Sequence, residues 1–460
     1  MKELAGWGRA PRARCAVFRP ERRSSVASIL ATGARSSYIA RGLGRSYGDS
    51  AINADAGVIA FERLNRFLGF DAEKGELHCE AGVSLGEILD VFLPRGFTLG
   101  VTPGTRHVTV GGAIAADVHG KNHHKAGTFG QYVNEFTLLT AGGEVLTCSD
   151  QEESDAFWAT IGGMGLTGMI LTAKLRLLPV ETSFLKVDYK RVANLDEALS
   201  VLKAGEERLP YVVAWVDGLA RGKALGRSVV MCGRHASRDE LPAHLREQPL
   251  PRPRPACFRM RFDLPGFALN HFSVKAFNAL YYATHDHAEG RLTDYRSFFY
   301  PLDSIHDWNR VYGRRGFIQY QAAFPLETSS AGLRELLEKV AATGRASFLT
   351  VLKGCGDENA APLSFPIKGH TLALDIPRRY GLEDLLCELD EIVLKHRGRV
   401  YLAKDAALSA ASLEQMYPRL EQFRAVVKRL DPRGLFASDQ ARRVGLKVRS
   451  ARTAIGSGSS

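Results

Sequence analysis

The chain has no run of about eighteen apolar residues, so the sequence predicts no helix that spans a bilayer. Its first twenty residues also lack the apolar stretch of a secretory signal. We therefore expect a cytoplasmic protein or one that lies peripherally on the plasma membrane. No long block of lysine and arginine and no zinc-finger or helix-turn-helix signature is present, so we expect no nucleic-acid binding. The net charge of +11 then favours solubility or attraction to anionic lipid and phosphate groups.

The sequence contains few cysteines, and their spacing shows no paired motif. Seven are present, an odd number, and none forms a C-x-x-C pair, which argues against a disulfide framework or zinc ribbon and favours a reducing compartment. Cys387 lies in residues 381–396, where apolar residues recur every three to four positions. We predict that its thiol is packed in the core of the protein.

The 460 residues suffice for two or three domains. Up to about residue 180, short strand and helix patterns alternate, with a capping box at Ser84 and Glu87 and a hairpin folded at 142–143. Beyond that point, longer strand patterns separated by helical ones predict a largely antiparallel sheet. Residues 246–272, rich in proline and arginine, predict a mobile surface loop, and residues 412–431 predict one helix that stops before a proline.

Two glycine-rich stretches raise the question of a ligand. In "ARGLGRSYGDSA", residues 40–51, glycines alternate with polar residues after a strand, so the turn can aim N–H groups at a pyrophosphate; a plain tight turn is the alternative. The single G-x-G-x-x-G, in residues 163–168, follows a helix and precedes a strand. That order is the reverse of a nicotinamide-binding Rossmann unit. It indicates instead a backbone that passes close to a ligand.

A histidine-rich stretch, "HGKNHH" at residues 119–124, raises the question of a metal. His119 and His123 have the spacing of a helical zinc pair, but Gly120 between them disfavours a helix. Lys121 and Lys125 would also repel a cation. We expect no metal, and interpret His119 as reaching a substrate hydroxyl beside backbone that packs on a flat ring.

These stretches together resemble a known family. "RGLGRSYGDSA", "PGTRHVTVGGAIAADVHGKNHHKAGTFG" and "FWATIGGMGLTG" resemble the FAD-binding domain of the vanillyl-alcohol-oxidase-like flavoproteins. The resemblance continues through "FYPLDSIHDWNRVYGRRGFIQYQ", "VYLAKD" and "LDPRGLFASDQARR" and is weakest from about 183 to 290. It implies an α+β fold of two domains, with an FAD-binding domain at 1–181 and a substrate-binding cap with an antiparallel sheet at 182–400. The C-terminal segment, 401–460, is implied to return to the FAD-binding domain.

The resemblance implies that FAD is the cofactor. Many members attach FAD covalently through a histidine at the position of Arg45, so we predict that FAD is bound non-covalently here. The cofactor-binding positions that the resemblance implies are Arg41, Gly42, Leu43, Gly44, Arg45, Ser46, Tyr47, Gly104, Thr105, Thr109, Gly111, Gly112, Ala115, Gly120, Asn122, His123, Gly127, Gly163, Gly165, Gly168 and Tyr401.

Within the family, the chain resembles members that oxidise the 2′-hydroxyl of a polyprenylphosphoryl-β-D-ribose to the 2′-keto sugar. That reaction is the first half of an epimerisation to the arabinose donor of cell-wall polysaccharide, and it implies a separate short-chain, NADH-dependent reductase as partner. The implied catalytic residues are Lys404, His119 and Tyr47. Lys404 would stabilise developing negative charge, and the other two would position or deprotonate the hydroxyl. The implied substrate-binding residues are Lys121, Trp215, Gln319, Gln321, Thr371, Ala373 and Lys404.

The chain also departs from the family pattern. Ala373 stands where mycobacterial members carry a cysteine beside the flavin, and His370 and Thr371 replace the usual Trp and Asn. These changes leave the exact sugar open. The alternatives are an FAD-dependent oxidase of another sugar, alditol or aldonolactone, and a non-catalytic nucleotide-binding or surface-binding protein. The first usually carries the histidine that Arg45 replaces, and the grouping of Tyr47, His119 and Lys404 across distant segments argues against the second.

Overall fold

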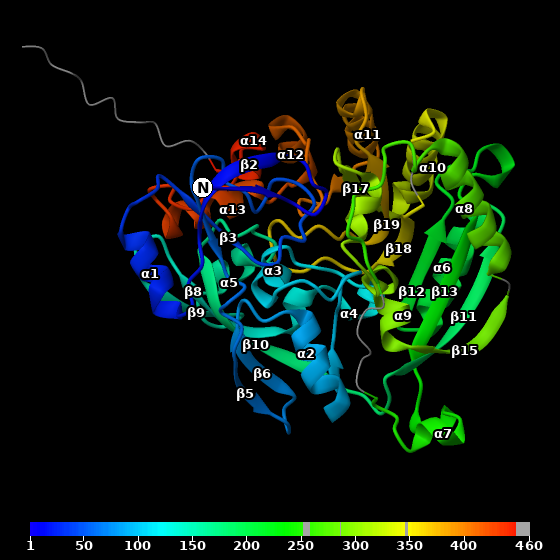
Figure 1. Ribbon diagram of the computed structural model, residues 1–460, viewed down its shortest axis with the longest axis horizontal. Coiled ribbons are helices and arrows are strands. Elements are labelled where there is room, and N and C mark those ends of the chain that lie inside the picture. Colours follow the sequence, from blue (N-terminus) through cyan, green and yellow to red (C-terminus); the bar gives the residue numbers. More distant parts are fainter. Residues whose placement is uncertain (252–257, 286, 346–347, 448–460) are drawn as a thin grey trace, which may run out of the picture.

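The computed structural model describes residues 1–251, 258–285, 287–345 and 348–447 (Figure 1). Part of the predicted proline- and arginine-rich loop, residues 252–257, lies outside these described residues. None of the described helices is long and apolar enough to cross a membrane.

Two sheets form the N-terminal half. The first has the order β1-β2-β4-β3, with β4 parallel to both β2 and β3, and the second has the order β5-β6-β10-β8-β9 with β7 paired to β10. The strands are β1 Lys2–Ala5, β2 Arg12–Phe18, β3 Tyr38–Arg41, β4 Gly57–Ala60, β5 Phe67–Asp71, β6 Glu76–Glu80, β7 Phe97–Leu99, β8 Val133–Leu139, β9 Val145–Ser149 and β10 Met169–Pro179. The helices are α1 Arg23–Ala31, α2 Leu85–Phe92, α3 Val110–Ala115, α4 His123–Ala126 and α5 Ser154–Thr160.

Three local predictions for this half are confirmed. Ser84 caps α2, accepting from the backbone N–H of Glu87, whose side chain accepts from the backbone N–H of Ser84. Strands β8 and β9 form the predicted hairpin around 142–143. The G-x-G-x-x-G glycines lie between α5 and β10, in the helix-then-strand order that excludes a Rossmann unit.

An eight-stranded sheet forms most of the remaining chain. Its order is β15-β11-β13-β12-β18-β19-β17-β20, and every pairing is antiparallel, as predicted. Helices α6, α10 and α11 pack against this sheet (Figure 1). The strands are β11 Phe184–Val192, β12 Tyr211–Val216, β13 Ser228–His235, β15 Ala288–Asp294, β17 Phe317–Pro325, β18 Thr350–Cys355, β19 Gly369–Pro377 and β20 Arg399–Val400. The helices are α6 Leu195–Arg208, α10 Leu326–Thr343 and α11 Leu382–Lys395.

Smaller elements lie beside this sheet. Strand β14, Phe258–Arg259, pairs in parallel with β16, Ile305–His306. The neighbouring helices are α7 Ala243–Arg246, α8 His271–Thr284 and α9 Tyr295–Phe299.

Two predictions are wrong. The single helix expected over residues 412–431 is two, α12 Ala410–Met416 and α13 Leu420–Leu430, because Pro418 between them cannot donate a helical hydrogen bond. Cys387 is exposed and not packed in the core. The buried face of α11 is carried by Leu382, Leu385 and Leu389, and a residue two positions after Leu385 points to the opposite side of the helix.

The C-terminal segment packs on the first sheet. Beyond β20 the chain leaves the large sheet, and Phe436 bridges to Tyr38 of β3. Arg443, at the end of α14 (Asp439–Arg443), forms an ion pair with Asp49 at 2.7 Å and with Asp405 at 2.8 Å. In Figure 1 the red C-terminal helices accordingly lie beside blue β2. The exact domain boundaries at 181 and 400 stay predictions.

Candidate active site

A cavity of about 620 Å³ lies between the glycine loops of the N-terminal half and one face of the eight-stranded sheet. That volume is in the usual range for a cofactor or substrate site. Most of the predicted site residues line this one cavity. They are Arg41, Gly42, Leu43, Gly44, Arg45, Ser46, Tyr47, Gly104, Thr105, Thr109, Gly111, Gly112, Ala115, His119, Gly120, Lys121, Gly165, Gly168, Trp215, Gln319, Gln321, Ala373, Tyr401 and Lys404.

Five predicted residues do not line the cavity, and the structure gives each a contact elsewhere. Asn122 donates to the carbonyl of Gly100 at 2.8 Å, and His123 Nδ1 accepts from the backbone N–H of Gly356 at 3.0 Å. Gly127 lies beside Gln131 with φ +67°, Gly163 packs against Ala159 and Phe423, and Thr371 bonds to Gln321 behind the wall. His119 and His123 share no helix, as expected: His123 begins α4, and His119 bridges to Thr128.

The register of the sheet explains why distant residues meet at the wall. Gln321 pairs with Ala373, Ala373 with Val351, and Val351 with Trp215 across four neighbouring strands. Side chains opposite one another in an antiparallel sheet point to the same face. This row therefore forms the floor of the cavity. The Trp215 indole N–H donates to the carbonyl of Phe348 at 2.9 Å, which fixes the ring in the wall.

The first glycine loop packs too closely for side chains at two positions. A Cβ on Gly42 would lie 2.2 Å from Thr109 Oγ1, and one on Gly48 would lie 1.9 Å from the carbonyl oxygen of Asp405. Thr109 is also the N-cap of α3, accepting from the N–H of Gly112. The glycines thus allow the loop at 42–48, α3 and the turn at 403–405 to meet around the cavity.

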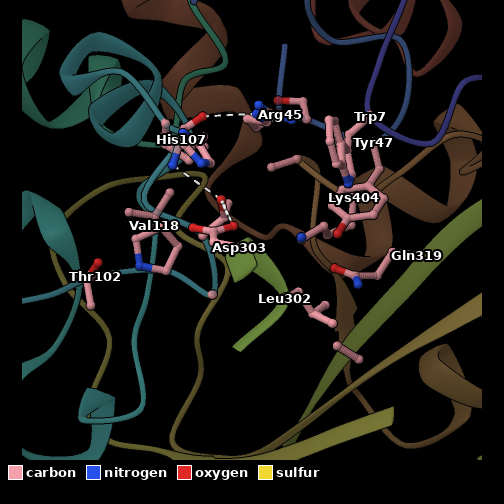
Figure 2. A pocket seen from close by; sticks show the side chains of 18 of the residues that line it. Trp7, Arg45, Tyr47, Thr102, His107, Val118, Leu302, Asp303, Gln319 and Lys404 are labelled. Carbon is pink, nitrogen blue, oxygen red and sulfur yellow. Dashed lines mark hydrogen bonds between the residues drawn. The ribbon is translucent and has the colours of Figure 1, made fainter. Parts of the chain in front are cut away.

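Lys404 is held over the ring of Tyr47. Its Nζ lies 3.9 Å from the ring centroid, and the backbone N–H of Tyr47 donates to the carbonyl of Ala403 at 3.0 Å. The carboxylate of neighbouring Asp405 forms an ion pair with Arg443 instead. Burial and the nearby ammonium of Lys353 lower the pKa of Lys404 to about 7, against an opposing effect of Asp375. Figure 2 shows Lys404 beside Tyr47 and Trp7.

Two further lysines line the same cavity. Lys121 donates to the carbonyl of Phe299 at 3.2 Å, and burial together with Lys353 lowers its pKa to about 7. Burial lowers the pKa of Lys353 to about 8. Lys353 was missed by the sequence analysis, and its only signal was a lysine inside the apolar strand pattern "SFLTVLKGC". Three half-buried lysine side chains in one cavity favour a ligand that carries negative charge.

His119 is fixed as a hydrogen-bond donor by its neighbours. The Thr371 hydroxyl donates to the carbonyl of Ala322 at 2.9 Å, so its oxygen accepts from Gln321 Nε2 at 3.2 Å. The other hydrogen of that amide points to His119 Nε2 at 2.9 Å. Burial and Lys353 lower the pKa of His119 well below its usual value, so the ring is neutral and its proton is on Nδ1. That buried N–H has no partner among the described residues.

A buried carboxylate supports the Lys404 end of the cavity. Asp375 accepts from Gln319 Nε2 at 2.6 Å and from the Tyr312 hydroxyl at 2.9 Å. Burial raises its pKa to about 7, and burial likewise raises the pKa of Tyr47 well above 10. Gln319 is therefore held in place from behind by Asp375.

The opposite wall combines predicted residues, Arg45 and Thr105, with Trp7, His107 and Asp303, which the sequence analysis missed. The Arg45 guanidinium lies 3.9 Å from the Trp7 ring centroid and donates to the carbonyl of His107 at 3.2 Å (Figure 2). Asp303 accepts from the Thr105 hydroxyl and from the backbone N–H of Arg106, both at 2.8 Å. These contacts tie the segment at 301–308 to the loop at 103–109 across the cavity.

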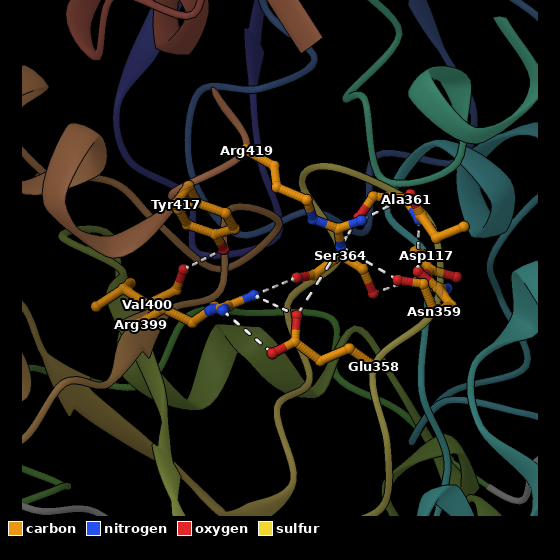
Figure 3. Close-up of polar contacts among 10 residues, drawn as sticks. Asp117, Glu358, Asn359, Ala361, Ser364, Arg399, Val400, Tyr417 and Arg419 are labelled. Carbon is orange, nitrogen blue, oxygen red and sulfur yellow. Dashed lines mark hydrogen bonds and ion pairs between the residues drawn. The ribbon is translucent and has the colours of Figure 1, made fainter. Parts of the chain in front are cut away.

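A second polar network joins the two halves behind His119. Asp117, at φ +40°, accepts from Ser364 and Asn359 at 2.7 Å each and from the N–H of Gly130 at 3.1 Å. Arg399 donates to the carbonyl of Ser364 at 3.0 Å (Figure 3). Because Asp117 stands between two residues that line the cavity, Ala116 and Val118, this network positions the wall.

Comparisons with known proteins agree with this geometry. Residues 15–149 match the FAD-binding domain family, and residues 315–444 match the D-arabinono-1,4-lactone oxidase family. The chain is 39% identical over 97% of its length to decaprenylphosphoryl-β-D-ribose oxidase of Mycolicibacterium smegmatis, covering 98% of that protein. It is 25% identical over 93% of its length to L-gulono-1,4-lactone dehydrogenase of Mycobacterium tuberculosis, covering 95% of it. L-gulonolactone oxidase of Mus musculus matches at 30% over 40% of the chain and 42% of that protein.

The residues of the cavity fit FAD. The glycine loop at 42–48 presents backbone beside Arg41 and Arg45, groups suited to a diphosphate. Ser50 lines the cavity with a buried hydroxyl that has no partner among the described residues. The lysines and the N–H of His119 supply positive charge and a donor for the carbonyl groups of a flavin ring. The glycine loops would therefore hold the cofactor, with the sheet residues facing the substrate.

Proposed function

Because the chain belongs to the FAD-dependent oxidoreductase family that includes decaprenylphosphoryl-β-D-ribose oxidase, we propose that it oxidises the 2′-hydroxyl of a polyprenylphosphoryl-β-D-ribose to the 2′-keto sugar. The observation that carries this proposal is the convergence of Lys121, Lys353 and Lys404 on one cavity beside Gln319 and Gln321. Two amides suit sugar hydroxyls, and cations suit the phosphodiester and the negative charge of the reaction. The keto sugar would serve an epimerisation that provides arabinose for cell-wall arabinan.

FAD supplies the electron chemistry when bound, accepting a hydride from the carbon of the alcohol. The chain itself has to orient the sugar and stabilise charge. We assign Lys404 to the negative charge that develops at the reacting centre, because its Nζ lies over the Tyr47 ring in the cavity wall. His119 donates from Nδ1 and positions its acceptor, and Lys121 pairs with the phosphodiester of the substrate.

We also propose that FAD is bound non-covalently, because Arg45 occupies the position of the usual attachment histidine and its guanidinium packs on Trp7. Acid precipitation should then release all of the yellow colour into the supernatant. Colour that stays with the precipitated protein would contradict this proposal.

The test of the main proposal is an anaerobic titration of the purified protein with a short-chain prenylphosphoryl ribose. The flavin absorbance is measured during the titration. We expect bleaching with this substrate and none with free ribose, because free ribose lacks the phosphodiester that Lys121 would bind. Flavin that stays oxidised with the prenylphosphoryl ribose but bleaches with an aldonolactone would favour the alternative, a lactone or alditol oxidase. That alternative is supported by the match of residues 315–444 to the arabinonolactone oxidase family.

The product of this reaction needs a second enzyme. Reduction of the 2′-keto group from the other face would give the arabino epimer, so we propose a short-chain, NADH-dependent reductase as partner. A reductase that converts the product only in the presence of this protein would support the pairing. We further propose peripheral contact with a membrane, because a substrate with a polyprenyl tail resides in one.

A further inference from the structure

One stretch of the chain gathers exposed phenylalanines. Residues 258–280 carry Phe258, Phe262, Phe267, Phe272 and Phe277, and among the described residues only Phe67 is another exposed phenylalanine. Phe267 is 77% exposed and Phe272 is 81% exposed, and Leu280 adds to them. Large apolar side chains gathered on a surface mark a contact with another molecule or with a membrane, whereas single ones scattered over a protein do not.

Helix α8 presents part of this apolar surface on a fixed support. Of its fourteen residues only Val274 and Asn278 are buried, and Asn278 Nδ2 donates to Asp217 at 2.7 Å. Asn270 caps the helix, accepting from two backbone N–H groups of its first turn. The helix is therefore anchored along one narrow side, and Phe272 and Leu280 stay exposed on a defined structure.

The same helix borders the cavity. Phe277, Tyr281 and His285, at spacings of four residues, line it together with Phe348 and Ile305. The rings of Phe277 and Phe348 are 5.5 Å apart, and those of Tyr281 and Trp215 are 4.5 Å apart. An apolar path of aromatic side chains thus leads from the substrate floor to the exposed surface of α8.

The charge of this stretch is positive. Residues 258–285 contain Arg259, Arg261 and Lys275, all exposed, and a single acidic residue, Asp263. Of these cations, Arg259 forms an ion pair with Asp307 at 3.6 Å. Asp263 is already neutralised by an ion pair with Arg9 at 2.7 Å. Exposed phenylalanines interspersed with cations are typical of segments that lie in the interface of an anionic bilayer. A bilayer also accounts for the position of this surface beside the cavity, because the polyprenyl tail of the proposed substrate resides in one.

We propose that residues 258–280 dock on an anionic lipid bilayer, with the phenylalanines among the acyl chains and the cations at the headgroups. The cavity then opens toward the bilayer, and the polyprenyl tail of the substrate leaves it along Phe277 and Phe348 without crossing water. This proposal rests on the proposed function for the identity of the tail. The binding of a bilayer itself depends only on the described surface.

The test compares sedimentation of the FAD-loaded protein with vesicles of phosphatidylcholine alone and with added phosphatidylglycerol. A triple variant, Phe267→Ser with Phe272→Ser and Leu280→Ser, removes the apolar surface. The matched control, Leu68→Ser with Val145→Ser and Leu326→Ser, removes three exposed apolar side chains elsewhere. Flavin content and flavin reduction by a short-chain substrate check that both variants are folded and active.

We expect the wild-type protein and the control to bind the anionic vesicles at low salt, and the triple variant to lose at least about tenfold in vesicle affinity. Lys275→Glu should weaken binding to the vesicles that contain phosphatidylglycerol and leave binding to phosphatidylcholine vesicles unchanged. Equal binding by the triple variant and the wild type, or no vesicle binding by the wild type, would overturn the proposal. So would a triple variant that changes only from dimer to monomer, since the surface would then bind a second copy of the chain.

The two proposals fail in different ways. Vesicle binding by a protein whose flavin is not reduced by prenylphosphoryl ribose would leave the docking surface standing and remove the proposed substrate. Flavin reduction by prenylphosphoryl ribose without vesicle binding would support the proposed substrate and remove the docking surface.

Discussion

Replacing Lys404 by methionine is expected to slow flavin reduction by about 10²–10³-fold while leaving FAD bound. Methionine keeps most of the length and the packing but removes the charge. A unit charge about 4 Å from a developing negative charge is worth roughly 4 kcal/mol at an effective dielectric constant near 20. Lys353 and Lys121 line the same cavity and retain part of that stabilisation. We therefore expect a loss of rate at the lower end of the stated range.

The pH dependence gives the prediction a second readout. The pKa of Lys404 is lowered to about 7 by burial, so its ammonium loses the proton as the pH rises through neutrality. If the ammonium form is the active one, the reduction rate falls with increasing pH, by about tenfold for each unit above that pKa. Lys404→Arg keeps the charge at all these pH values, so this variant should show only the weaker alkaline decline that Lys121 and Lys353 cause, although its rate is lower than that of the wild type.

Stopped-flow measurement of anaerobic flavin bleaching, between pH 6 and pH 9 in roughly half-unit steps, separates these outcomes. Lys125→Met, at an exposed position of α4, is the matched control and should behave as the wild type. A Lys404→Met protein that reduces its flavin at the wild-type rate, or whose alkaline decline is as steep as that of the wild type, would refute the assignment of this ammonium.

Three further predictions concern the scaffold. Asp117→Ala removes the acceptor of the Ser364 hydroxyl and the Asn359 amide, and it leaves alanine in the left-handed backbone region. We expect it to lower the free energy of unfolding by roughly 3–5 kcal/mol in urea titrations, and an effect below about 1 kcal/mol would contradict the role of this network. Asp390, bonded to the Tyr320 hydroxyl at 2.8 Å, has its pKa raised to about 7 by burial. The folded state thus holds a proton that the unfolded chain releases near pH 4, and this contribution to stability is lost as the pH rises through 7. Asp390→Asn should therefore gain roughly 2–3 kcal/mol relative to the wild type between pH 5 and pH 8, and a pH-independent difference in melting would argue against it. Gly42→Ala should lower the FAD content of the purified protein because its Cβ would strike Thr109, and full flavin occupancy would show that the loop yields.

Much of the local structure could be predicted from the sequence. The capping box at Ser84 and Glu87, the hairpin at 142–143 and the antiparallel sheet depend on neighbouring residues or on the period of apolar residues. The prediction for Cys387 was wrong although the helical period contains the answer: Cys387 follows Leu385 by two positions, which places it opposite the buried leucines. The helix expected over 412–431 was extended too far for a related reason, since the continuous pattern masked the break at Pro418.

The sequence by itself determined which segments carry glycine, histidine and lysine, and its resemblance to a known family connected those segments with a flavin and a charged sugar. Only the tertiary structure decided that Lys353, on β18, joins Lys121 and Lys404 in one cavity, because that meeting depends on strand register across the large sheet. It also decided the tautomer of His119, which is set by Thr371 through Gln321 over more than two hundred residues of chain. Hydrogen bonds of that kind exist only between residues that folding brings together.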